Sequence, residues 1–148
     1  MSPEPVQWNP SFETGLQFID QEHAALLEQL NVLIDLLVRE VPTSQWLPEL
    51  DRLIAAVGEH FAHEERIMDN IGYPGYHTHH QQHQHLLQEV AEFRGGIAAT
   101  APEDTLATVR FLKFWVLKHM VQEDSKIGQH IHRGLKEFPL NPTHGGQQ

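Results

Sequence analysis

Histidines spaced one helical turn from another histidine or a carboxylate are the side chains of this sequence best suited to chemistry. The 148 residues include 12 histidines, which is too many for solvated surface alone to explain in a small protein. The segment HFAHE places His60 four residues before Glu64. The segment HHQQH places His79 four residues before His83. Residues four apart lie on one face of a helix and can reach one small site together.

Two further segments extend this pattern to other parts of the chain. In HMVQED, Asp124 comes five positions after His119, which overshoots one helical turn by about 140°. That spacing requires a bent helix or an off-axis reach of one side chain. His23 stands in line with Leu27 and Leu30, near the start of the first helical stretch.

Five neutral imidazoles and two carboxylates suit borderline cations such as iron, zinc, copper or manganese. Seven groups exceed what one ion can take, so the sequence predicts two ions, with both carboxylates available to bridge them. Iron is favoured over zinc, because a closed zinc site would use four ligands and stop. The predicted metal ligands, drawn from four helices, are His23, His60, Glu64, His79, His83, His119 and Asp124.

The other histidines are expected on the surface or in the terminal tail, because their neighbours place them off the apolar stripes. They are His63, His77, His80, His85, His130, His132 and His144. Glu65, beside Glu64, is expected to face solvent in the same way. Leu27, Met68 and Trp115 are expected in the hydrophobic core, where they can also shape a ligand pocket.

Four stretches carry apolar residues at helical spacing, with helix-breaking residues between them. No internal repeat and no strand-like alternation competes with this pattern. The stretches cover about residues 20–41, 43–71, 73–95 and 102–119, and the last is expected to continue, with a kink, to residue 135. Short connections between long helices predict an all-α, antiparallel up-down four-helix bundle.

Helix starts are predicted from capping residues and prolines. Asp20 is a candidate N-cap of the first helix. Pro48 is tolerated in the second helix if it falls in the first turn. Thr100 and Glu103 match a capping box for the fourth helix, with Pro102 in its first turn.

The sequence is expected to form one domain over residues 1–148. Residues 1–18 contain prolines and aromatic residues and are expected to form an extended N-terminal arm, followed by the bundle at 19–137. Residues 138–148 form a polar, proline- and glycine-rich tail that is expected to be disordered.

Composition excludes several classes of function. The formal net charge of −10 repels phosphate backbones, so nucleic acid and anionic membrane surfaces are poor partners. The absence of cysteine excludes disulfides, thiolate zinc sites and iron–sulfur clusters. No apolar run approaches the length of a membrane span, and no secretory signal begins the sequence, so a cytoplasmic location is expected.

The order H…HxxxE…HxxxH…HxxxxD resembles the hemerythrin family over roughly residues 8–135. The segments that carry the resemblance are IDQEH, HFAHEERIM, YPGYHTHHQQH and LKFWVLKH, followed by Asp124. The five-residue spacing before Asp124 is the family's own. One departure is the carboxylate of Glu22 directly before His23, where the family more often has glutamine.

The resemblance implies how the ligands divide between two irons. His79, His83 and His119 would hold one iron with its protein positions filled. His23 and His60 would hold the other, which keeps an open position for dioxygen. Glu64 and Asp124 would bridge the irons together with an oxo or hydroxo group.

The expected function is reversible dioxygen binding at this non-haem di-iron site, as a carrier, store or sensor rather than an enzyme. Only two of the seven ligands are anionic, unlike the carboxylate-rich sites of di-iron oxidases. Leu27, Phe61, Met68 and Trp115 are expected to exclude water. A di-iron enzyme that consumes peroxide, nitric oxide or dioxygen is the alternative, and an iron store, with many more than two irons per chain, is a third class. No protein partner is identified.

Overall fold

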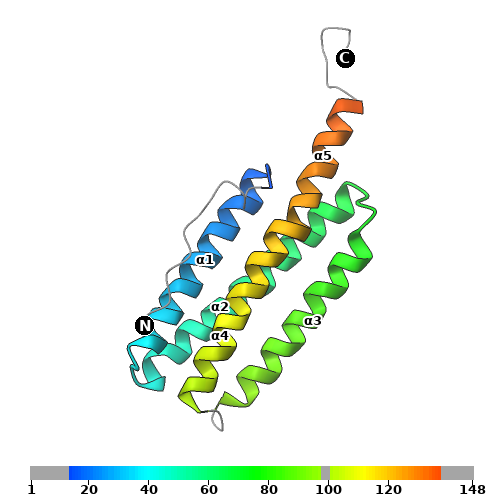
Figure 1. Ribbon diagram of the computed structural model, residues 1–148. Helices are drawn as coiled ribbons and strands as arrows, with labels where there is room; N and C mark the ends of the chain where they lie inside the picture. The colour runs from blue at the N-terminus through cyan, green and yellow to red at the C-terminus, as the bar shows by residue number, and fades with distance from the viewer. Residues whose placement is uncertain (1–13, 98–100, 138–148) are drawn as a thin grey trace.

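The computed structural model describes residues 14–97 and 101–137 (Figure 1). The expected tail at 138–148 and most of the expected arm lie outside the described residues, so the division into arm, bundle and tail stays a prediction. The helices are α1 (Gln17–Val38), α2 (Thr43–Asn70), α3 (Tyr76–Gly95), α4 (Pro102–His119), the π-helical segment η3 (Met120–Asp124) and α5 (Ser125–Glu137).

The four long helices form an antiparallel up-down bundle, as predicted. α1 packs against α2 and α4, and α2 packs against α3. Short connections reverse the chain between neighbours, and α5 continues the line of α4 beyond the bundle (Figure 1). The beginnings of α1 and α3 therefore lie at the same end of the bundle as the ends of α2 and α4.

Each helix buries a stripe of residues spaced three or four apart. The fully buried apolar side chains on these stripes are Ile19, Leu30, Leu33, Leu50, Met68, Val109, Met120 and Ile127. The predicted core position of Leu27 is confirmed, and Trp115 is partly buried against the Phe61 cluster. Helices with one apolar face are stable only when that face is covered by others, so these stripes determine the four-helix arrangement.

The start and end of α1 differ from the prediction. The helix begins at Gln17, and Asp20 lies inside it. Asp20 instead organises the residues before the helix, because the backbone N–H and the hydroxyl of Thr14 donate to its Oδ1 at 2.7 and 2.8 Å. The helix ends at Val38, before the predicted 41, because Glu40 adopts a left-handed conformation with φ of 57°.

Two other expectations about helix starts are corrected. Pro48 lies in the second turn of α2, which starts at Thr43, and the helix accommodates it there. The N-cap of α4 is Ala101, which makes no side-chain cap, so the capping box from Thr100 is wrong, and Thr100 itself is outside the described residues. Pro102 opens the helix as expected.

The π-helical segment between His119 and Asp124 explains their five-residue spacing. A π turn contains one residue more than an α turn, because its backbone hydrogen bonds join residues five apart. His119 and Asp124 are both buried and 3.0 Å apart at Nε2 and Oδ1. The helix therefore brings both side chains to the same interior face and continues as α5, as predicted.

A close backbone contact connects α5 to the residues before α1. A Cβ atom on Gly128 would lie 1.8 Å from the carbonyl oxygen of Thr14. We expect Gly128→Ala to lower the free energy of unfolding by about 1–3 kcal/mol, because the backbone must move apart. Gly58→Ala is the control: it has open space on α2 and should raise stability by about 0.5–1 kcal/mol. Urea denaturation measures both, and equal effects would contradict the contact.

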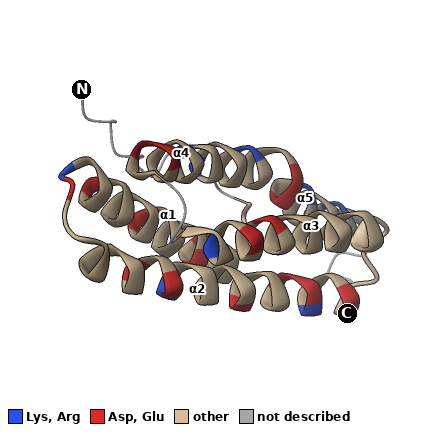
Figure 2. Ribbon diagram, turned by 90° about the horizontal axis from the view of Figure 1, so that it is seen from below, with Lys and Arg blue, Asp and Glu red and all other residues tan. Residues whose placement is uncertain are grey.

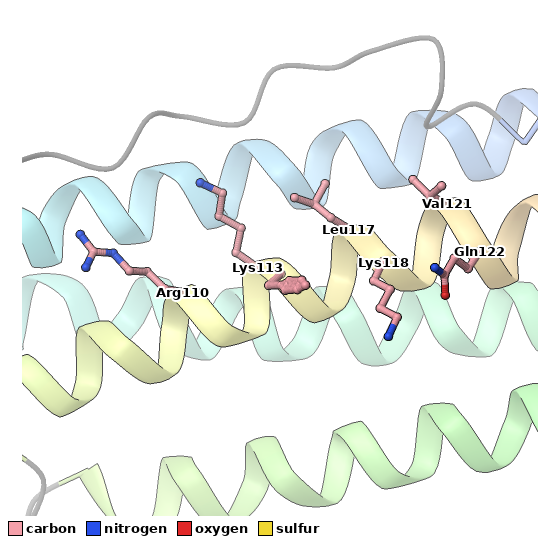
Figure 3. Close-up of a pocket in the computed structure, with 7 residues that line it drawn as sticks. Arg110, Lys113, Leu117, Lys118, Val121 and Gln122 are labelled. Carbon is pink, nitrogen blue, oxygen red and sulfur yellow. The ribbon is translucent and has the colours of Figure 1, made fainter.

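Charge on the outer surface is mostly negative. Acidic residues occur on all four bundle helices, and Lys and Arg are fewer (Figure 2). A groove of about 660 Å³ follows the outside of α4 (Figure 3) and contains none of the predicted metal ligands. No described helix is both long and apolar enough to cross a membrane.

Candidate metal centre

The antiparallel bundle brings all seven predicted ligands to one end. His23 lies near the start of α1, and His79 and His83 lie near the start of α3. The remaining ligands come from the later parts of α2 and α4 and from η3. All seven side chains are buried, with at most 6 % of any of them exposed. The ligands continue the buried stripes of their helices, which is why they face the interior.

The seven side chains form two overlapping groups, each able to hold a metal ion. One group contains His79, His83 and His119, whose Nε2 atoms meet: that of His119 lies 3.1 Å from His79 and 3.3 Å from His83. The other group contains His23 and His60. Glu64 and Asp124 belong to both groups.

The oxygens of Glu64 and Asp124 divide between the two groups. Glu64 Oε1 lies 3.1 Å from His83 Nε2, and Glu64 Oε2 lies 3.3 Å from His60 Nε2. Asp124 Oδ1 lies 2.9 Å from His79 Nε2, and Asp124 Oδ2 lies 2.8 Å from His23 Nε2. Each carboxylate thus presents one oxygen to each group, which is the arrangement that a bridging ligand requires.

Several polar atoms at this centre have no hydrogen-bond partner. They include both ring nitrogens of His23, Nε2 of His60, both oxygens of Glu64 and Oδ1 of Asp124. Buried polar atoms are nearly always paired, so such a concentration requires another occupant. Lone pairs that converge at short distance without forming hydrogen bonds fit a pair of cations, so the donor set suits the predicted metals.

Protons substitute for cations in the metal-free site. Burial opposes a charge on His23, but the carboxylates of Asp124 and Glu64 outweigh it and raise the pKa of His23 to about 9. The same balance raises the pKa of His79 to about 9. Burial also opposes ionisation of Glu64 and Asp124, but the surrounding imidazoles hold the pKa of both carboxyls below their usual range.

Metal loading at pH 7 should therefore release at least two protons per chain, because His23 and His79, each with a pKa of about 9, must deprotonate before they can bind a cation. Titration calorimetry in buffers of different ionisation enthalpy measures this release. The proton release should fall towards zero at about pH 10, above both pKa values.

A raised histidine pKa contributes stability that is complete below pH 6.5 and is lost as the pH rises through about 9. The apo protein should accordingly weaken over that interval, and a pH-independent release would contradict the assignment.

Aromatic rings cover two of the ligands. The ring of Phe61 stacks on His83 with centroids 3.7 Å apart, and Trp115 stacks on His119 at 4.7 Å. These apolar faces limit access of water to the three-histidine group. Phe61 and Trp115 therefore contact ligand rings, and exclusion of water by Leu27, Phe61, Met68 and Trp115 stays a prediction.

Two carboxylates at the centre were not predicted as part of it. Glu65 was expected to face solvent, but it is only 16 % exposed and contacts His80 and His83. Glu22, noted only as a departure from the family pattern, contacts His60 and His63. A sequence signal existed in both cases, because each glutamate directly adjoins a predicted ligand.

The remaining histidines lie outside the two groups. His77, His85 and His132 are exposed, as expected, and His144 lies outside the described residues. His130 is half-buried beside Tyr73. His63 and His80 are also only partly exposed, and the expectation that they are plain surface residues is wrong because each shares a carboxylate with a buried histidine.

Known proteins match most of this chain. The bacteriohemerythrin of Stenotrophomonas maltophilia is 27% identical over 140 residues, which cover 94% of this chain and 90% of that protein. The myohemerythrin of Sipunculus nudus is 29% identical over 124 residues, which cover 84% of this chain and 92% of that protein. The crystal structure of wild-type hemerythrin superposes with a TM-score of 0.76 at 27% identity, covering 84% of this chain and 95% of that one.

The family model for the hemerythrin HHE cation binding domain matches residues 14–131. This range contains all seven residues of the two overlapping groups. It also includes the four bundle helices, η3 and the first half of α5. The chain therefore belongs to the hemerythrin family.

Proposed function

We propose that this chain binds dioxygen reversibly at a pair of non-haem iron ions. The proposed iron ligands are His23, His60, Glu64, His79, His83, His119 and Asp124. The observation that carries the proposal is the unequal division of the histidines. Both groups share the two carboxylates, but one group has three histidines and the other has two. The group with two histidines can therefore keep one coordination position free for a small ligand.

The protein's own residues give this site its character. The histidines would hold the ions through Nε2, and Glu64 and Asp124 would each offer one oxygen to each ion. An iron pair supplies electrons that can move to dioxygen and return when it leaves. With only two anionic ligands among seven, the site favours reversible binding over further oxidation chemistry. Phe61 and Trp115 cover the rings of His83 and His119 in the three-histidine group.

The similarity to proteins described as hemerythrin, bacteriohemerythrin and myohemerythrin supports the proposed dioxygen binding. Carriage, storage and sensing of dioxygen share this binding step. We therefore propose the binding step itself as the function of the domain, with a bridging oxo or hydroxo group between the irons.

The test is a visible absorption spectrum of the anaerobically reduced protein loaded with iron. Admission of dioxygen should produce charge-transfer bands, and evacuation should remove them until slow autoxidation prevails. Azide should bind the oxidised protein and compete for the same position. The proposal is falsified if reduced protein with both irons bound gives no reversible change. Sustained consumption of dioxygen, peroxide or nitric oxide would instead favour the enzymatic alternative.

A further inference from the structure

Two buried histidines of the metal centre each contact, through Nδ1, a carboxylate on another helix. Nδ1 of His60, on α2, lies 2.7 Å from Glu22 Oε1 on α1. Nδ1 of His83, on α3, lies 2.8 Å from Glu65 Oε2 on α2. His60 belongs to the two-histidine group and His83 to the three-histidine group. Each proposed iron thus has one histidine with such a partner.

The second oxygen of each carboxylate is also engaged. Glu22 Oε2 lies 2.6 Å from His63 Nδ1, and Glu65 Oε1 lies 2.7 Å from His80 Nδ1. In both cases the outer histidine stands three residues from the inner one on the same helix. We call each set, the glutamate with its inner and outer histidine, a carboxylate tether.

The outer histidines are themselves positioned by aromatic side chains. Phe18 packs against His63 with centroids 5.4 Å apart, and Tyr76 stacks on His80 at 5.9 Å with nearly parallel rings. With both oxygens engaged, neither carboxylate can rotate freely. The same arrangement therefore occurs twice, built from three different helices.

We propose that Glu22 and Glu65 are positioning residues, each holding one histidine of one iron in the orientation and tautomer that binding requires. This inference rests on the proposed di-iron function. When Nδ1–H donates to the carboxylate, the lone pair of Nε2 is directed to the metal. The negative charge behind the ring also makes the imidazole a stronger donor, which stabilises the bound cation.

A surface pair on α3 provides the matched comparison. His85 and Glu89 also join an imidazole to a carboxylate, but their side chains are 72 % and 45 % exposed. Water screens such a pair, and neither residue belongs to the two groups of the metal centre. His60 and His83, in contrast, are 3 % and 0 % exposed. Burial is what enables a tether to control the direction of a ring.

The test uses cobalt(II), which fills iron-type sites without redox change and gives shifted proton resonances for nearby imidazole N–H groups. The variants are Glu22→Ala and Glu65→Ala, with Glu22→Gln and Glu65→Gln as conservative forms and Glu89→Ala as the control. Competition with a chromophoric chelator gives the affinity for each of the two cobalt ions. Exchange of the shifted Nδ1–H signals with solvent is measured on the same samples.

We expect each alanine variant to weaken one of the two cobalt ions by about 10- to 100-fold and to leave the other nearly unchanged. One slowly exchanging Nδ1–H signal should become fast, and a different one in each variant. The glutamine variants keep an acceptor oxygen and the side-chain volume, so they should recover part of the affinity. Glu89→Ala should change neither affinity nor exchange.

Unchanged cobalt affinity and unchanged N–H exchange in the glutamate variants would overturn the proposal. Equal loss of both ions, together with a lower melting temperature of the apo protein, would also overturn it, because that result shows only structural damage. The glutamine variants decide the question if an alanine variant fails to fold. A wild-type protein that binds no pair of ions would instead refute the proposed function, before any variant is compared.

Discussion

Replacing Glu64 by alanine should reduce the iron content from about two ions per chain to less than one. Glu64 is fully buried and presents one oxygen to each group of histidines, so its removal takes a ligand from both ions at once. Asp124→Ala should have a similar effect, since Asp124 divides its oxygens in the same way. Metal analysis after expression in iron-replete medium measures the loss.

His77→Ala is the control for this experiment, because His77 is exposed on the same helix as two proposed ligands. It should retain both ions. His80 is unsuitable as a control, because it shares the carboxylate of Glu65 with His83. Full iron content in Glu64→Ala, or the same loss in all of these variants, would show that the bridging assignment is wrong.

Removal of iron should lower the melting temperature by roughly 8–16 °C for each of the two ions. An ion bound only by the native state at 1,000 times its dissociation constant contributes about 4 kcal/mol, and each kcal/mol shifts a chain of this length by about 2–4 °C. Calorimetry at pH 7, with a chelator and then with iron restored, measures the difference.

The same calorimetric comparison on Glu64→Ala separates site binding from nonspecific effects. Iron should no longer raise the melting temperature of that variant, because one ligand of each ion is missing. An equal response in both proteins, or no response in the wild type, would mean that the ions do not bind at this centre.

Periodicity was sufficient to predict the helices of the bundle and their direction. Stripes such as Leu30 and Leu33 on α1 recur every three or four residues, and prolines and glycines separate the helices. Helix starts were harder to predict, because a capping residue can bond elsewhere. Asp20 has the right side chain for an N-cap, but it accepts hydrogen bonds from Thr14 inside an established helix.

Prediction from the sequence has a similar limit at the metal centre. Each of the seven buried residues lies on the apolar stripe of its own helix, and such a stripe can be recognised in the sequence. The tethers depend on how one helix is rotated against its neighbour, which no single-helix pattern records. Glu65 lies off the stripe of α2, yet the neighbouring α3 presents His83 and His80 to it.

In genetic terms, the π-helical segment is equivalent to one extra codon inside an α-helix. Loss of the codon for Val121 or Gln122 would leave an uninterrupted α-helix and place the aspartate four residues after His119. Because the π turn accommodates the extra residue within one turn, the residues after the aspartate would keep the faces that they have now. Ile127 and Gly128 would therefore still contact the bundle and Thr14. A search for ligand pairs restricted to four-residue spacing would overlook this helix.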